Sequence, residues 1–289
     1  MNSHSLVLPS PVELLDHPLV RRSACKLYIK REDKIHPGYG GNKWRKLKYN
    51  IEEYQAGGYT HLITFGGAFS NHLAAVGEIC AAEKIPCVAI VRGTYRDPDN
   101  PTLAKVSGHG MTLHHVTKEA YKQKEHSDEV KEVLTEYKQP LLIPEGGSNR
   151  LALRGVEELM AEEHKEGRHY DYVILAAGTG TTAAGVIMGS QQEQIIVINA
   201  LKNLELEQTI KDLCPSDKTN WTVNNDYHFG GFARTTPALI DFINEFKSNH
   251  DIPLDPVYNG KAMYATLELI QQGHIPKGAS ILYLSLIHI

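Results

Sequence analysis

The sequence has few cysteines, no long apolar run and no excess of positive charge, and each absence excludes a class of protein. Its four cysteines form no C-x-x-C pair and are too few for a disulfide framework in 289 residues, so we expect a reducing, cytoplasmic environment. No stretch approaches the roughly 20 apolar residues of a membrane span, and the first residues lack the features of a secretion signal. The formal net charge of −4 gives no reason to expect nucleic acid or an anionic membrane as a partner.

Motifs of several common catalytic sites are also missing. There is no H-E-x-x-H zinc motif and no G-x-S-x-G nucleophile motif, and no glycine-rich loop is followed by the lysine of a Walker loop. The fifteen histidines do not fall at metal-ligand spacing. His114 and His115 lie in an apparent strand, where neighbouring side chains point to opposite faces. The sequence therefore predicts no metal site.

What the sequence does contain is a regular alternation of short apolar runs and longer helical patterns. The runs are typical of strands and cover residues 61–65, 87–93, 111–117, 141–147, 172–178 and 195–201. Helical patterns fall near residues 70–85, 118–137, 150–166 and 181–191. This order predicts an α/β fold with parallel sheets flanked by helices. The length suits two domains or one large unit, and with two domains the chain would cross between them near residues 45 and 155.

The first motif that suggests chemistry is GYGGNKWRKL, residues 38–47. It places Lys43 after a glycine-rich turn, at the start of a predicted helix. The helix dipole and the basic residues that follow both disfavour the charged ammonium. A neutral lysine amine is the form that bonds to carbonyl carbons. The alternative is a solvated basic helix face that follows a turn.

The second motif is AAGTGTTAAG, residues 176–185, which follows a predicted strand and opens a predicted helix. Backbone N–H groups at such a turn form an anion site, and threonine hydroxyls add donors for phosphate oxygens. The expected phosphate-binding residues are Gly178, Thr179, Gly180, Thr181 and Thr182. The motif also matches a loose dinucleotide fingerprint, but the next strand does not end in the acidic residue that would hold a ribose. The remaining alternative is a tight turn that binds nothing.

The third motif is FGGAFSNH, residues 65–72, in which Ser70, Asn71 and His72 begin a predicted helix. Serine and asparagine are common helix caps, and capping alone could explain them. They could instead hold a substrate carboxylate at the helix N-terminus. A reactive lysine, a phosphate turn and a carboxylate site are together the parts needed for pyridoxal 5'-phosphate acting on an amino acid.

These motifs, with PEGGSN (144–149) and LDPVYNGKAM (254–263), make the sequence resemble the family of 1-aminocyclopropane-1-carboxylate deaminases and D-cysteine desulfhydrases. The motifs run in the family's order from about residue 10 to about residue 284. The resemblance implies the fold of the tryptophan-synthase β subunit, in a homodimer. It implies a large cofactor-binding domain of residues 1–45 plus 155–289 and a small mobile domain of residues 46–154.

The resemblance also implies roles for individual residues. Lys43 would form the Schiff base with pyridoxal 5'-phosphate and move the α-proton. Ser70 would be the catalytic serine, and Asn71 would bind the cofactor's phenolic oxygen as well as the substrate. The turn of residues 178–182 would hold the phosphate. Tyr258 would lie against the pyridine ring and act near the substrate, which His72 would also contact.

Two positions depart from the deaminases of the family and direct the choice of substrate. Asn259 replaces the glutamate that follows the tyrosine in the deaminases, and a neutral amide supplies no charge to the pyridine nitrogen. Phe232, in FGGFAR, lies on the substrate side and replaces a tyrosine. Both changes favour β-elimination from a D-amino acid such as D-cysteine, giving pyruvate, ammonia and hydrogen sulfide. The alternative within the same chemistry is 1-aminocyclopropane-1-carboxylate deamination.

A further alternative is a non-catalytic protein that keeps the fold and binds an amino acid or a nucleotide. Lys43, Ser70 and Tyr258 argue against it. The C-terminus departs from the family as well, because the strand expected over residues 278–284 is followed by SLIHI rather than by a glycine-rich turn, and the chain ends in LSLIHI (284–289). We expect the natural protein to continue, with these last six residues partly or wholly an artefact of sequence assembly.

Overall fold

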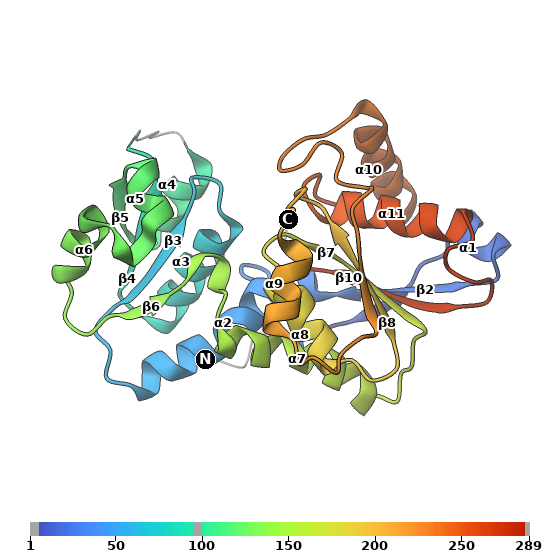
Figure 1. Ribbon diagram of the computed structural model, residues 1–289, viewed down its shortest axis with the longest axis horizontal. Helices are drawn as coiled ribbons and strands as arrows, with labels where there is room; N and C mark the ends of the chain where they lie inside the picture. Colours follow the sequence, from blue (N-terminus) through green and yellow to red (C-terminus); the bar gives the residue numbers. More distant parts are fainter. Residues whose placement is uncertain (1–5, 95–99, 287–289) are drawn as a thin grey trace. The chain divides into compact units, whose positions relative to one another are not determined.

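Alternating strands and helices build two units, each around its own sheet (Figure 1). The computed structural model describes residues 6–94 and 100–286. The smaller unit takes its described residues from 43–152, and the larger unit takes them from 6–42 and 153–286. No helix in these described ranges has the length and apolar character needed to cross a bilayer. The four cysteines are free thiols.

The smaller unit has a sheet of four parallel strands in the order β5-β4-β3-β6. The strands are β3 (Leu62–Gly66), β4 (Cys87–Arg92), β5 (Thr112–Val116) and β6 (Leu141–Ile143). The helices are α2 (Asn42–Ala56, whose first residue belongs to the larger unit), α3 (Asn71–Glu83), α4 (Pro101–Gly108), α5 (Lys118–Gln123) and α6 (Asp128–Thr135).

Strand alternation decides which helix covers which face of this sheet. On β3, Ile63 and Phe65 point into a core that includes residues of α5 and α6. Thr64 lies between them in the strand, points to the other face and contacts His72 of α3. The N-terminus of α3 therefore lies over the Thr64 face of the sheet.

The larger unit has a sheet of six strands in the order β1-β2-β10-β7-β8-β9, in which only the β1–β2 pair is antiparallel. The strands are β1 (Val12–Leu14), β2 (Lys26–Arg31), β7 (Tyr172–Ala177), β8 (Gln194–Asn199), β9 (Trp221–Asn224) and β10 (Ser280–Ser285). The helices are α1 (Pro18–Arg22), α7 (Arg150–Lys165, which starts just before the unit boundary), α8 (Thr181–Gly189), α9 (Leu206–Leu213), α10 (Pro237–His250) and α11 (Asn259–Gln271).

Helices cover both faces of this larger sheet (Figure 1). Ile174 of β7 packs with residues of α1, α10 and α11. Its neighbours Val173 and Leu175 point the other way and pack with residues of α7, α8 and α9. Both faces of the central strands are buried, which explains why these strands appear in the sequence as continuous apolar runs.

Two expected elements are shorter than their sequence patterns suggested. The helical pattern over residues 118–137 is interrupted at Lys124, whose φ of 53° is left-handed, and α6 starts anew after the Ser127 cap. The expected strand over residues 141–147 ends at Ile143. Pro144, Gly146 and Gly147 then form a turn, because the positive φ values of the two glycines do not fit extended strand backbone.

Candidate functional site

Lys43 is the second residue of α2 and belongs to the smaller unit. Its side chain is half-buried, and burial lowers the pKa of its ammonium to about 8. The direction agrees with the sequence-based expectation, but the cause is burial rather than the neighbouring basic residues. The alternative of a solvated basic face is wrong, because Arg45 and Lys46 are only 0% and 1% exposed.

Lys46 follows Lys43 by almost one helical turn and is a buried amine that sequence reasoning did not assign to the site. Its Nζ donates a long hydrogen bond of 3.4 Å to Ser148 Oγ. Burial and the nearby charge of Lys43 lower the pKa of Lys46 well below its usual value. Two amines with lowered pKa values therefore occur within one turn of α2. The sequence feature that could have identified Lys46 was the i, i+3 spacing of the two lysines on a helix that was expected to bury one face.

Ser70, Asn71 and His72 form the start of α3, also in the smaller unit. Ser70 is the cap residue, and its Oγ accepts a hydrogen bond of 3.3 Å from the N–H of Leu73, so the expected capping role is confirmed. Asn71 is exposed, whereas His72 is only 3% exposed. Burial lowers the pKa of His72 well below its usual value, helped by the charges of Lys43 and Lys46. His72 is therefore a neutral imidazole.

In the larger unit the glycine turn joins β7, which ends at Ala177, to α8, which begins at Thr181. A Cβ at Gly178 would lie 3.0 Å from Leu201 Cδ1 and 3.2 Å from Tyr258 Cε1, so a side chain here would crowd both residues. Gly180 has a φ of 89° and occupies the cap position of α8, where it offers no side-chain oxygen. The cap position thus suits an oxygen supplied by a ligand.

The threonines of this turn are held from inside the same unit. Thr181 and Thr182 are 1% and 8% exposed, while Thr179 is exposed. Asn42, the residue before the reactive lysine in the sequence, donates from Nδ2 to Thr182 Oγ1 at 2.9 Å. The GGNK motif and the glycine turn are therefore directly connected, although about 140 residues separate them in the chain.

Tyr258 is positioned by Asp255, which sequence reasoning did not single out. The carboxylate of Asp255 accepts hydrogen bonds from the N–H groups of Val257, Tyr258 and Asn259 at 2.7 to 2.9 Å. These bonds fix the backbone at the start of α11 and leave the Tyr258 ring against the glycine turn. Burial raises the pKa of Tyr258, so its phenol stays protonated. In the sequence, Asp255 stands within the LDPVYNGKAM motif, four residues before the first residue of α11.

Asn259 is completely buried, and its side chain has one partner and one unused donor. Oδ1 accepts a long hydrogen bond of 3.4 Å from the N–H of Leu286. Nδ2 has no hydrogen-bond partner among the described residues. A buried amide donor without a partner fits a ligand that brings an acceptor, such as a pyridine nitrogen.

Phe232 lies in a turn of the larger unit and is 62% exposed. The turn contains left-handed residues from Phe229 to Ala233 and is anchored by Lys261. Lys261 Nζ donates to the backbone oxygens of Ala200, His228 and Gly231 at 2.8 to 3.0 Å. The lysine of the LDPVYNGKAM motif therefore holds the segment that carries Phe232.

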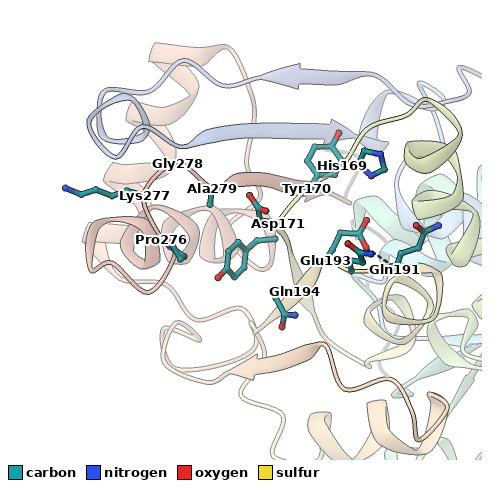
Figure 2. Close-up of a pocket in the computed structure, with 12 residues that line it drawn as sticks. His169, Tyr170, Asp171, Gln191, Glu193, Gln194, Pro276, Lys277, Gly278 and Ala279 are labelled. Atoms are coloured by element: carbon teal, nitrogen blue, oxygen red, sulfur yellow. Dashed lines mark hydrogen bonds between the residues drawn. The ribbon is translucent and has the colours of Figure 1, made fainter.

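A cavity of about 710 Å³ lies elsewhere in the larger unit (Figure 2). Asp171, Gln194 and Ala279 line it, and they lie at the amino-terminal ends of β7, β8 and β10. The glycine turn instead follows the carboxyl end of β7, where ligands of open α/β sheets bind. None of the predicted site residues lines this cavity, so we do not assign the active site to it. Within the described ranges, no group of three metal-ligating side chains could hold an ion.

The family model described as "Pyridoxal-phosphate dependent enzyme" matches residues 6–285 of the chain. The chain belongs to this family. Pyridoxal 5'-phosphate is therefore its cofactor, as the sequence predicted. The buried threonines, the side-chain-free cap at Gly180 and the unused Asn259 donor fit a group that brings a phosphate and a ring nitrogen.

Curated relatives share sequence along nearly the whole chain. A putative 1-aminocyclopropane-1-carboxylate deaminase of Pyrococcus abyssi is 28% identical over 292 residues, covering 95% of this chain and 88% of the relative. The 1-aminocyclopropane-1-carboxylate deaminase of Variovorax paradoxus (strain S110) is 29% identical over 318 residues, with coverage of 97% and 92%. These names favour the deaminase alternative over the desulfhydrase interpretation.

Solved structures agree on the fold. The crystal structure of an ACC deaminase homologue matches with a TM-score of 0.81 at 25% identity, covering 98% of this chain and 90% of that chain. A fungal L-serine ammonia-lyase from Rhizomucor miehei matches with a TM-score of 0.67 at 16% identity, with coverage of 98% and 94%. The α/β fold of the tryptophan-synthase β type is thereby confirmed, and the family match confirms a pyridoxal-phosphate-dependent enzyme.

Proposed function

We propose that this chain is a pyridoxal-phosphate-dependent lyase that removes the amino group of a small amino acid. The first candidate substrate is 1-aminocyclopropane-1-carboxylate. The main support for the proposal is Lys43. Burial lowers the pKa of its amine, so that part of it is unprotonated, and the cofactor of this family carries an aldehyde to which such an amine can bond. The choice of substrate rests on the names of the curated relatives.

In this proposal the residues that would hold the cofactor have separate roles. When bound, pyridoxal phosphate withdraws electrons from the substrate's α-carbon. The Lys43 amine would bond to the cofactor's aldehyde carbon and would later move the substrate's α-proton. The turn of residues 178–182 holds the phosphate through backbone N–H groups and threonine hydroxyls. Tyr258 supports the ring and works near the substrate, while Asn259 donates from Nδ2 to the ring nitrogen.

The substrate side of the proposal uses the start of α3. The Ser70 hydroxyl and the Asn71 amide bind the substrate carboxylate beside the helix N-terminus. Asn71 also binds the cofactor's phenolic oxygen, and Phe232 contributes apolar surface toward the substrate. The proposal includes a mobile smaller domain, a cofactor-holding larger domain and a homodimeric assembly.

D-Cysteine is the second candidate substrate, and Asn259 is the observation that favours it. A neutral amide leaves the ring nitrogen unprotonated, which weakens electron withdrawal. Elimination of a thiol needs less withdrawal than opening a carbon ring, because the sulfur takes the electrons. Phe232 also lacks a hydroxyl that could assist ring opening.

The test is turnover of separate substrates by the purified chain loaded with cofactor. Ring opening of 1-aminocyclopropane-1-carboxylate with water yields 2-oxobutanoate and ammonia, whereas D-cysteine yields pyruvate, ammonia and hydrogen sulfide. The first pair of products supports the first candidate, and sulfide from D-cysteine alone supports the second. Ammonia from neither substrate, with the cofactor demonstrably bound, contradicts both. A Lys43→Ala variant is the control for non-enzymatic release.

A further inference from the structure

The hydrogen bonds of His72 determine which of its ring nitrogens carries the proton. Thr64 Oγ1 lies 2.9 Å from the backbone oxygen of Ile143, which can only accept, so the hydroxyl donates its single proton there. The same hydroxyl lies 2.8 Å from His72 Nε2 and must therefore accept from it. Nε2 of the neutral ring carries the proton, and Nδ1 is an acceptor.

That acceptor has no partner in the part of the chain that the structure describes. His72 is 3% exposed and Nδ1 makes no hydrogen bond to any described residue. Gly147 lies beside the ring, because a Cβ built on it would be 3.4 Å from His72 Cε1 and 3.7 Å from Nδ1. The same Cβ would be 3.6 Å from Lys46 Cβ. The Nδ1 lone pair is thus buried beside the backbone of Gly147 and the Cβ of Lys46.

The groups around Nδ1 favour a donor rather than an anion. Burial lowers the pKa of Lys43, Lys46 and His72, and the charge of Lys43 further lowers the pKa of the other two. Nδ1 offers only a lone pair in the tautomer that Thr64 imposes. A carboxylate would meet the Nδ1 lone pair unfavourably, whereas an N–H group would form a hydrogen bond with it.

We propose that His72 Nδ1 accepts a hydrogen bond from the amino group of the arriving substrate, and that Thr64 is the positioning residue that keeps Nδ1 available. This rests on the proposed function, which supplies an amino acid as the ligand. An incoming amino group must reach the neighbourhood of the Lys43 amine in order to replace it on the cofactor. The His72 ring and Lys46 Cβ lie beside the same glycine, Gly147. Lys46 is about one turn of α2 from Lys43, so Nδ1 lies in that neighbourhood. The amino group keeps its proton in this step, because the ring is a weak base.

Nitrogen NMR of the full chain with labelled histidine tests the tautomer without any turnover. The His72 signals are assigned by their loss in His72→Gln. We expect a pyridine-like Nδ1 and a pyrrole-like Nε2 that do not titrate between about pH 6 and about pH 8. Thr64→Ser should keep this pattern, and Thr64→Val should lose it. A protonated Nδ1 in the wild-type chain overturns the proposal. This result needs no variant, so it holds even if Thr64→Val fails to fold.

The ligand is tested with two probes added to the same chain before the cofactor. D-Alanine carries an amino group and a carboxylate but no leaving group, and propionate carries only the carboxylate. D-Alanine should shift the Nδ1 signal, and propionate should not. No shift with D-alanine, or equal shifts with both, overturns the proposal.

With cofactor loaded, Thr64→Val should raise KM about tenfold with a smaller effect on kcat. A chain that binds no cofactor yet shows the D-alanine shift would contradict the proposed function alone.

Discussion

At Lys43, burial in the smaller unit sets the pH at which the amine becomes reactive. Only the neutral amine attacks an aldehyde, and its pKa is lowered to about 8. Below that value the neutral fraction falls tenfold for each pH unit, and above it the fraction is nearly constant. We therefore predict that the rate of cofactor capture rises with pH and levels off above about pH 8. Stopped-flow absorbance after mixing with pyridoxal phosphate measures this rate.

A rate that continues to rise toward the ordinary lysine pKa of about 10.4 would contradict this account of Lys43. Lys48→Ala is the matched control, because Lys48 lies on the same helix and is also half-buried. This variant should follow the wild-type curve.

Asn259 is the residue where the identity of one atom decides the chemistry. Its unused Nδ2 donor suits an unprotonated ring nitrogen, whereas a carboxylate would hold a proton on that nitrogen. We predict that Asn259→Glu, and the nearly isosteric Asn259→Asp, shift the visible spectrum of the loaded enzyme. Asn259→Thr, a neutral replacement, should leave the spectrum close to wild type. Unchanged spectra in both acidic variants would mean that residue 259 does not face the ring nitrogen.

Residue-level reasoning from the sequence reached the reactive lysine but not its surroundings. Lys43 could be predicted because a glycine turn and a helix start are local features. Asp255 and Lys261 act through backbone groups that a motif does not reveal. The tautomer of His72 depends on Thr64 and Ile143, which the parallel pairing of β3 and β6 brings together across 79 residues. No local pattern contains that information.

At the scale of elements, a buried ion pair joins β2 to α7 in the larger unit. Lys30 Nζ lies 2.7 Å from Glu163 Oε1, and both side chains are completely buried. Glu163 also accepts hydrogen bonds from Arg168 and Tyr170. We predict that Lys30→Met lowers the free energy of unfolding by about 3–5 kcal/mol, because it leaves a buried carboxylate short of a partner. Urea unfolding followed by circular dichroism measures the change.

The exposed Lys211–Glu207 pair on α9 provides the control. Its partners are more than half exposed, so Lys211→Met should change the free energy of unfolding by less than about 1 kcal/mol. Equal effects of the two substitutions would contradict a special contribution from the buried pair.

Element order could be predicted from the sequence wherever apolar runs were continuous. The central strands β3, β4, β7 and β8 were found because most of their residues are buried on both faces, which makes most positions apolar. The edge strand β1 has three residues and a half-exposed pattern, which gives too little signal. The break at Lys124 was missed because a single left-handed residue leaves the polar pattern of the surrounding helices unchanged.

At the scale of the whole molecule, the resemblance predicts a homodimer. Sedimentation of the cofactor-loaded chain should give twice the mass of the 32.2 kDa chain at micromolar concentration. A single species of 32.2 kDa under the same conditions would contradict the prediction.

The central claim is that Lys43 bonds to pyridoxal phosphate, and one absorption measurement tests it most directly. Three proteins are compared: the wild-type chain, Lys43→Ala and Lys48→Ala. Each is mixed with the cofactor, unbound cofactor is removed, and a visible absorption spectrum is recorded. We predict the absorption band of a lysine-bound cofactor in the wild type and in Lys48→Ala, and its loss in Lys43→Ala. The same band in all three would mean that another amine bonds to the cofactor, and it would contradict this account of the site.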